Sequence, residues 1–148
     1  MNRSSVLFVS AAAAVAVWSA PAVAQTKAFT AHLSVVPLTV AMQETVAGRG
    51  SATAVLAGNR LTIEGTFGGL RSPATTARLH VAARAQRGEA VAELTVSKAT
   101  SGTLKGVVEL NGRQREALDK LSLYIQINSE RAPEGNLWGW LVPQEVKR

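Results

Sequence analysis

The chain has 148 residues, a formal net charge of +6 at pH 7, 47% hydrophobic residues and no cysteine. Without cysteine no disulfide is available, so burial of apolar surface alone must hold the fold together. The basic residues are scattered and do not alternate with aromatic residues, which argues against a nucleic-acid-binding protein. A basic surface of this kind predicts mild attraction to anionic partners such as polyanionic glycans or lipid headgroups.

The beginning of the chain has the pattern of a cleavable signal peptide. Arg3 precedes an apolar run over residues 6–18, and the triplet Ala22-Val23-Ala24 forms a small-residue cleavage site. The apolar run is shorter than the roughly 20 residues that cross a bilayer. We therefore expect a signal peptide over residues 1–24, cleaved between Ala24 and Gln25. The product is expected in the periplasm or secreted, with no stable membrane insertion after cleavage, and loss of Arg3 lowers its net charge by one.

Downstream of the leader, the dominant hydrophobic period is two, which is typical of half-buried strands. It predicts strands over 29–35, 51–55, 61–64, 77–82, 90–96, 103–110, 122–129 and 136–142. Gly58-Asn59 is expected to join the second and third of these as a hairpin, because glycine adopts the positive φ of a tight turn. Pro133-Glu134-Gly135 is expected to join the last two as a type I turn.

One short helix is predicted between the strands. Asn111 has the side chain of an N-cap and Gln114 follows three residues later, as in a capping box. Ala117, Leu118 and Leu121 then supply an apolar stripe. About eight short strands with one helix predict an all-β, single-domain antiparallel Greek-key sandwich or barrel.

Four segments between residues 29 and 141 resemble conserved segments of the CHRD (chordin-like) domain family. They are Gly65-Thr66-Phe67-Gly68-Gly69-Leu70, Ala77-Arg78-Leu79-His80, Leu123-Tyr124-Ile125-Gln126-Ile127-Asn128-Ser129 and Pro133-Glu134-Gly135-Asn136-Leu137-Trp138-Gly139-Trp140-Leu141. The resemblance makes residues 25–148 a CHRD-like β domain. It implies a β-sandwich or barrel akin to copper–zinc superoxide dismutase and a function that is mostly unassigned. In animal chordins such domains occur in an extracellular protein that binds growth factors, a context that does not transfer to a small stand-alone domain.

The chain departs from the family pattern at positions where the family often carries histidine or charged residues. Arg78 and Asn128 stand where histidines are common, and Asn136 and Trp138 replace a glutamate and an arginine. An amide-, indole- and guanidinium-bearing patch thus takes the place of a histidine-rich one.

The sequence offers few candidate residues for catalysis or for metal binding. A zinc or copper site needs about three good protein ligands, but the chain offers only His32, His80, a single aspartate, Asp119, and no cysteine. There is no Gly-x-Ser-x-Gly nucleophile elbow and no glycine-rich phosphate loop. We therefore expect no metal, no cofactor and no enzymatic activity.

A polar and aromatic strand face is the best candidate site. A two-residue period puts Arg78 and His80 on one side of their strand. In the same way, it puts Gln126 and Asn128 on one side of their strand, and Trp138 and Trp140 on one side of the last strand. The predicted binding residues are Arg78, His80, Gln126, Asn128, Trp138 and Trp140. Such a patch suits carbohydrate or protein binding, because ring faces stack while amides donate and accept hydrogen bonds. The alternative is structural: the tryptophans close one end of a barrel.

Three hypotheses for the function follow. The first is an exported, non-catalytic binding or accessory module of the CHRD type with an unknown protein or glycan ligand and no nucleic-acid partner. The second is a structural envelope protein that self-associates. The third is a metal-dependent, dismutase-like enzyme.

Overall fold

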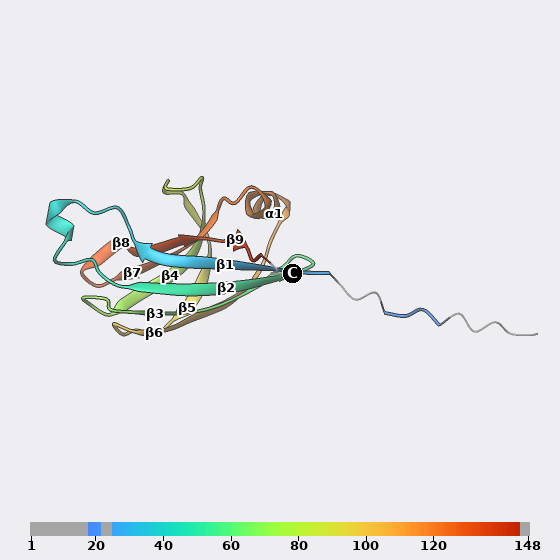
Figure 1. The fold of residues 1–148 in the computed structure, drawn as a ribbon, viewed down its shortest axis with the longest axis horizontal. Helices are drawn as coiled ribbons and strands as arrows, with labels where there is room; N and C mark the ends of the chain where they lie inside the picture. The colour runs from blue at the N-terminus through green and yellow to red at the C-terminus, as the bar shows by residue number, and fades with distance from the viewer. Residues whose placement is uncertain (1–17, 22–24, 146–148) are drawn as a thin grey trace, which may run out of the picture.

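The computed structural model describes residues 18–21 and 25–145 (Figure 1). Of the predicted leader over residues 1–24, only residues 18–21 are described, and Ala24 at the expected cleavage site lies outside the described residues. No helix in the described part of the chain has the length and apolarity needed to cross a membrane.

Nine strands, one α-helix and one turn of 3-10 helix form the fold of the described residues. In chain order they are β1 (Thr26–Val35), η1 (Val40–Met42), β2 (Arg49–Ala57), β3 (Arg60–Gly68), β4 (Ala74–Val81), β5 (Glu89–Val96), β6 (Gly102–Glu109), α1 (Gly112–Asp119), β7 (Leu123–Ser129), β8 (Ala132–Trp140) and β9 (Val142–Pro143). The eight predicted strands and the helix are all present.

The first eight strands close into an antiparallel barrel. Their order around it is β1-β2-β3-β6-β5-β4-β7-β8, with β8 pairing back to β1, and the short β9 continues along β1. Because β6 rather than β4 lies beside β3, the connections form a Greek key. This confirms the predicted all-β Greek-key class, as a barrel. The β1–β2 connection with η1 projects at one end, and α1 covers the other end, where β1 begins (Figure 1).

The barrel interior is filled by the inward side of each strand. Residues such as Leu33, Ile63, Leu79 and Ile125 are fully buried there, and Leu118 of α1 closes the end. Burial of this apolar surface is the main stabilising contribution in a chain with no disulfide.

The hairpin and the helix cap follow the sequence prediction. Gly58 has φ 60° in the turn between β2 and β3. Asn111 and Gln114 make the reciprocal hydrogen bonds of a capping box, at 2.9 and 3.0 Å. Leu121 differs from its prediction: it lies after the helix in the left-handed region, with φ 58°.

The predicted type I turn at Pro133-Glu134-Gly135 is wrong. The chain reverses earlier, at Glu130 and Arg131, so that Ser129 pairs with Ala132. The Ser72 hydroxyl accepts the Arg131 N–H at 2.9 Å and helps to fix this reversal. Residues 133–135 then form a bulge in β8, since Ile127 next pairs with Leu137. A bulge suits proline, which has no N–H for the ladder.

Candidate functional site

The six predicted site residues lie together on the outside of three neighbouring strands, β4, β7 and β8. Arg78 pairs with Gln126, which pairs with Trp138. Two residues further along β4, His80 pairs with Tyr124, which pairs with Trp140. In the opposite direction, Thr76 of β4 pairs with Asn128. We call these residues, with Tyr124, the aromatic face: Arg78, His80, Tyr124, Gln126, Asn128, Trp138 and Trp140.

The rings of the aromatic face pack on one another. His80 stacks on Tyr124 with centroids 4.9 Å apart, and Tyr124 stacks on Trp140 at 4.6 Å. Trp138 meets Trp140 edge to face at 4.7 Å. Offset and edge-to-face arrangements are the preferred ones for aromatic pairs. The four rings therefore form a continuous cluster across the three strands.

Two segments cover this cluster. The β1–β2 connection contributes Val36, Met42 and Val46 to it, and the β4–β5 connection over residues 82–88 contributes Ala82. As a result the indoles keep only a small exposed part, 7% for Trp138 and 9% for Trp140. Much of the indole area thus serves packing outside the barrel.

The polar atoms of the rings anchor the 82–88 loop at both ends. Trp140 Nε1 donates to the Ala82 carbonyl at 3.0 Å. At the other end of the loop, the Tyr124 hydroxyl accepts the Gly88 N–H at 2.9 Å, and His80 Nδ1 donates to the Gly88 carbonyl at 2.9 Å. The loop is therefore fixed to the aromatic face by three hydrogen bonds.

The surroundings of His80 favour its neutral form. Burial lowers its pKa below the usual 6.5, against the raising effect of the hydrogen bond to Gly88, and the charge of Arg78 lowers it further. The Arg78 guanidinium itself pairs with Glu93 at 3.0 Å.

The amide side of the face is also internally bonded. Gln126 Nε2 donates to Asn128 Oδ1 at 2.9 Å and to the Glu134 carbonyl at 3.3 Å. Gln126 is buried, whereas Arg78, His80 and Asn128 are half-buried. An incoming ligand can therefore touch the last three at the edge of the face, but not the Gln126 amide.

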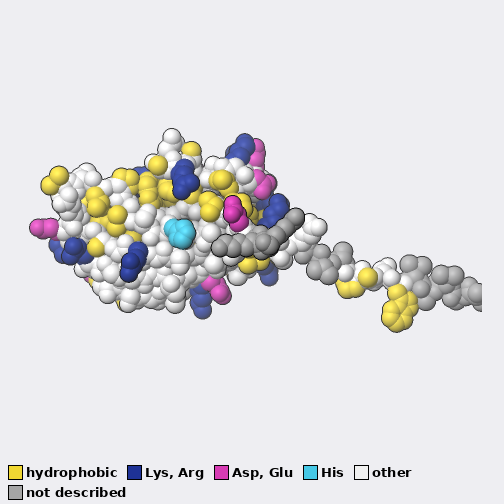
Figure 2. All heavy atoms as spheres, viewed as in Figure 1, with side chains coloured by type: hydrophobic (Ala, Val, Ile, Leu, Met, Phe, Trp, Pro, Cys, Tyr) yellow, Lys and Arg dark blue, Asp and Glu magenta, His cyan; other side chains and the backbone are white. Residues whose placement is uncertain are grey.

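A hollow of about 230 Å³ opens beside the indoles. It is lined by His32 and Ser34 of β1, by Trp138 and Trp140 of β8, and by Arg84 of the 82–88 loop. Ala85, Gly139 and Val142 complete the lining. In Figure 2 hydrophobic side chains gather over the part of this view where β8 and β9 lie, with a histidine and basic side chains at the border of the patch. We call this space the Arg84 hollow.

The sequence pattern does not predict this hollow. It offers His32 only as a candidate metal ligand, and nothing in it marks Ser34 or Arg84. The alternation of β1 puts His32 and Ser34 on its outer side, but the pairing of β1 with β8 that brings them beside Trp138 joins residues far apart in the chain. The 82–88 loop has no periodic pattern that places Arg84.

Comparison with protein families matches residues 29–141, from within β1 to just past β8, to the CHRD domain. The chain belongs to the CHRD domain family. Family membership, predicted from the four resembling segments, is thereby confirmed, and it fits a small binding or accessory module. No curated protein and no solved structure matches the chain.

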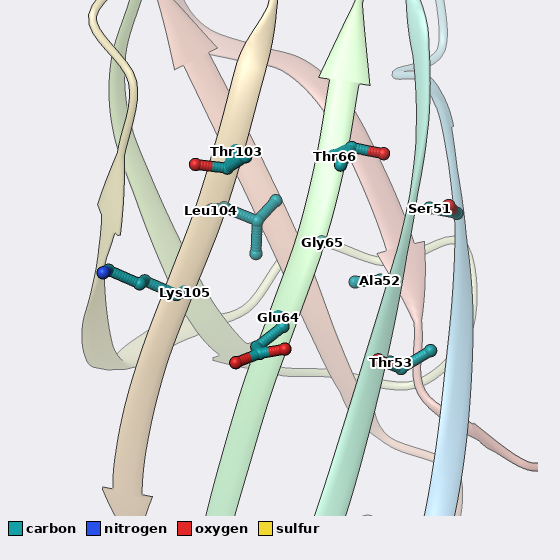
Figure 3. Close-up of a pocket in the computed structure, with 9 residues that line it drawn as sticks. All are labelled: Ser51, Ala52, Thr53, Glu64, Gly65, Thr66, Thr103, Leu104 and Lys105. Atoms are coloured by element: carbon teal, nitrogen blue, oxygen red, sulfur yellow. The ribbon is translucent and has the colours of Figure 1, made fainter.

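A second hollow of about 440 Å³ lies on another outer surface of this CHRD domain. Figure 3 shows Ser51, Thr66 and Thr103 in one row across β2, β3 and β6, with Gly65 of β3 next to Thr66. Thr53, Glu64 and Lys105 form the other row. We call it the threonine trough. Unlike the Arg84 hollow, it has no aromatic side chain in its lining.

No three His, Cys, Asp or Glu side chains gather closely enough to hold a metal ion within residues 18–21 and 25–145. His32 lies at the Arg84 hollow, while His80 is bonded to the 82–88 loop.

Proposed function

We propose that this CHRD domain is an exported, non-catalytic binding or accessory module that recognises a glycan or protein ligand. Its recognition surface is the exposed edge of the aromatic face together with the adjoining Arg84 hollow. One observation carries the proposal: two indoles, an imidazole, a hydroxyl and a guanidinium from β1, β8 and the 82–88 loop line the same hollow. Concave sites with an apolar lining and a few polar groups are typical of ligand binding.

The compartment is part of the proposal. The signal-peptide pattern of residues 1–24 supports export through cleavage between Ala24 and Gln25. A module delivered to the periplasm or secreted meets envelope glycans and exported proteins there.

A pull-down from the native envelope with a blocked hollow tests the binding role. Ser34→Tyr places a large ring in the hollow from an exposed strand position where tyrosine is well tolerated. The matched control is Thr66→Tyr, an exposed strand position in the threonine trough. We expect the wild type and Thr66→Tyr to capture the same ligand and Ser34→Tyr to lose it. Equal capture by all three proteins would contradict the proposal.

Self-association is the second candidate, and the surface around the threonine trough favours it. Val55 and Val107 flank Thr62 on the outside of β2, β3 and β6 and are 43% and 60% exposed. Analytical ultracentrifugation at high concentration tests it. Oligomers that dissociate on Val107→Asp would support this candidate, and a strict monomer would eliminate it.

A further inference from the structure

We infer that the Arg84 hollow binds a carboxylate-bearing sugar, a hexuronate unit of an acidic polysaccharide. The inference rests on the proposed function and names the ligand class of that same site. It follows from the charge, the rigidity, the size and the hydrogen-bonding groups of the hollow.

The charge of the hollow is positive and uncompensated. Arg84 is exposed, and it has no ion-pair partner among the residues that the structure describes. None of the eight lining residues carries a carboxylate. A guanidinium binds a carboxylate with two parallel hydrogen bonds, which are stronger than neutral ones. The hollow therefore favours an anionic group beside Arg84.

The loop that carries Arg84 is held in place before any ligand arrives. Ala82 is bonded to Trp140, and Gly88 is bonded to Tyr124 and His80. Between these anchors the Gln86 N–H donates to the Ala83 carbonyl at 3.0 Å, which forms a turn around Arg84. A fixed backbone lowers the ordering cost of binding.

The volume of the hollow and its two lining tryptophans suit one sugar ring. Its 230 Å³ is below the roughly 300–1,000 Å³ of pockets for drug-sized ligands. The exposed parts of Trp138 and Trp140 offer apolar contact to the C–H groups of such a ring.

Two polar residues of β1 in the lining can form hydrogen bonds with the hydroxyl groups of a sugar. The His32 ring and the Ser34 hydroxyl both donate and accept, and both are exposed on β1. A simple carboxylate would leave these groups and the indoles without a partner, and a neutral sugar would leave Arg84 without one. A hexuronate engages all of them.

Tryptophan fluorescence provides a direct readout. The chain has three tryptophans, and Trp18 belongs to the predicted leader. The chain from Gln25 onward holds every strand and helix of the fold, and its two tryptophans both line the hollow. We expect sodium glucuronate and galacturonate oligomers to change the emission of this chain saturably. Glucose at the same concentrations should produce no change.

Two substitutions separate the specific site from general charge attraction. Arg84→Ala should weaken uronate binding by about tenfold or more, the usual size of a charge-assisted hydrogen bond. The control Arg113→Ala removes an equal charge from an exposed position of α1 and should leave binding unchanged. No saturable response to uronates, equal response to glucose, or equal loss in both variants would overturn the inference.

Failure of this inference is distinguishable from failure of the proposed function. If the envelope ligand is captured by the wild type, lost on Ser34→Tyr and not displaced by glucuronate, the binding role stands and the uronate assignment is wrong. If capture is unaffected by Ser34→Tyr, the site itself is wrong.

Discussion

At the scale of single residues, Trp140 combines packing with a hydrogen bond. Its ring stacks on Tyr124, and its Nε1 holds the 82–88 loop through Ala82. The same side chain lines the Arg84 hollow. The structural role and the proposed binding role therefore overlap at this residue, and the two alternatives drawn from the sequence do not exclude each other.

Graded substitutions of Trp140 measure its structural contribution. Trp140→Ala should lower the free energy of unfolding by about 3–5 kcal/mol, as is usual when a large buried aromatic is truncated. Trp140→Phe keeps most of the apolar contact and loses the donor to Ala82, so a cost nearer ~1 kcal/mol is expected. Urea denaturation of the variants checks both values. An alanine variant as stable as the wild type would show that the indole is not packed.

The shifted pKa of His80 predicts a pH-dependent stability. Its pKa is lowered below 6.5 in the folded protein, so the unfolded chain binds more protons in the range just below pH 6.5. The free energy of unfolding should therefore fall as the pH drops through that range. His80→Phe keeps a ring on Tyr124 but cannot titrate, so this part of the pH dependence should vanish. Denaturation curves between pH 5 and 8 measure it, and identical slopes in the two proteins would disprove it.

Period two identified the residues of the aromatic face, because the outward side of each strand is set by alternation. It did not predict how deeply Trp138 and Trp140 are buried. Their cover comes from Val36, Met42 and Val46 in a connection that has no regular period. Burial by an irregular segment has no counterpart in the strand pattern.

At the scale of elements, the contact between β8 and β1 is a narrow seam of the barrel, as is the contact between β5 and β6. Only Ser34 and Val35 of β1 pair with β8, at Trp138 and Leu137. Gly139 follows this pairing, and a Cβ there would lie 2.4 Å from the His32 carbonyl oxygen. The absence of a side chain at Gly139 lets the two strands approach each other. Residues of both β1 and β8 line the Arg84 hollow.

Gly139→Ala should therefore strain the seam. The added methyl group meets backbone atoms that cannot rotate away, so a loss of stability of about 1–3 kcal/mol is expected. Gly68→Ala in β3 is the control, because a Cβ there meets only the Ser101 side chain at 3.6 Å. Thermal and urea unfolding of both variants provide the comparison. Equal stability of the two would mean that the close approach at Gly139 is not required.

The elements show where local sequence signals suffice. The Gly58 hairpin and the Asn111 capping box are built from neighbouring residues, and both are present as predicted. The reversal before β8 instead depends on Ser72, which is distant in sequence and bonds Arg131. Pro133-Glu134-Gly135 has the composition of a turn, but this tertiary contact moves the turn and leaves the three residues as a bulge.

At the scale of the whole molecule, a closed barrel needs neither disulfides nor unpaired edges among its eight main strands. Closure also joins β1 to β8 and creates the Arg84 hollow from residues at opposite ends of the chain. No local pattern predicts that juxtaposition. It arises only when the Greek-key order is complete.

Export makes a prediction of its own. Expression in a Gram-negative host should give a periplasmic product whose mass and N-terminal sequence begin at Gln25, because the Ala22-Val23-Ala24 site precedes it. Mass spectrometry of the periplasmic fraction measures this. A full-length chain retained in the membrane fraction would rule out the cleaved leader.

The proposal that this CHRD domain binds an acidic sugar at the Arg84 hollow, beside the exposed edge of the aromatic face, can be tested directly. The most direct measurement is a ¹H–¹⁵N NMR titration of the chain from Gln25 onward with acidic oligosaccharides. We predict saturable shifts of the Trp138 and Trp140 indole N–H signals and of the Arg84 and Ser34 amides, with the trough residue Thr66 unmoved. Shifts confined to the threonine trough, or none at all, would contradict it.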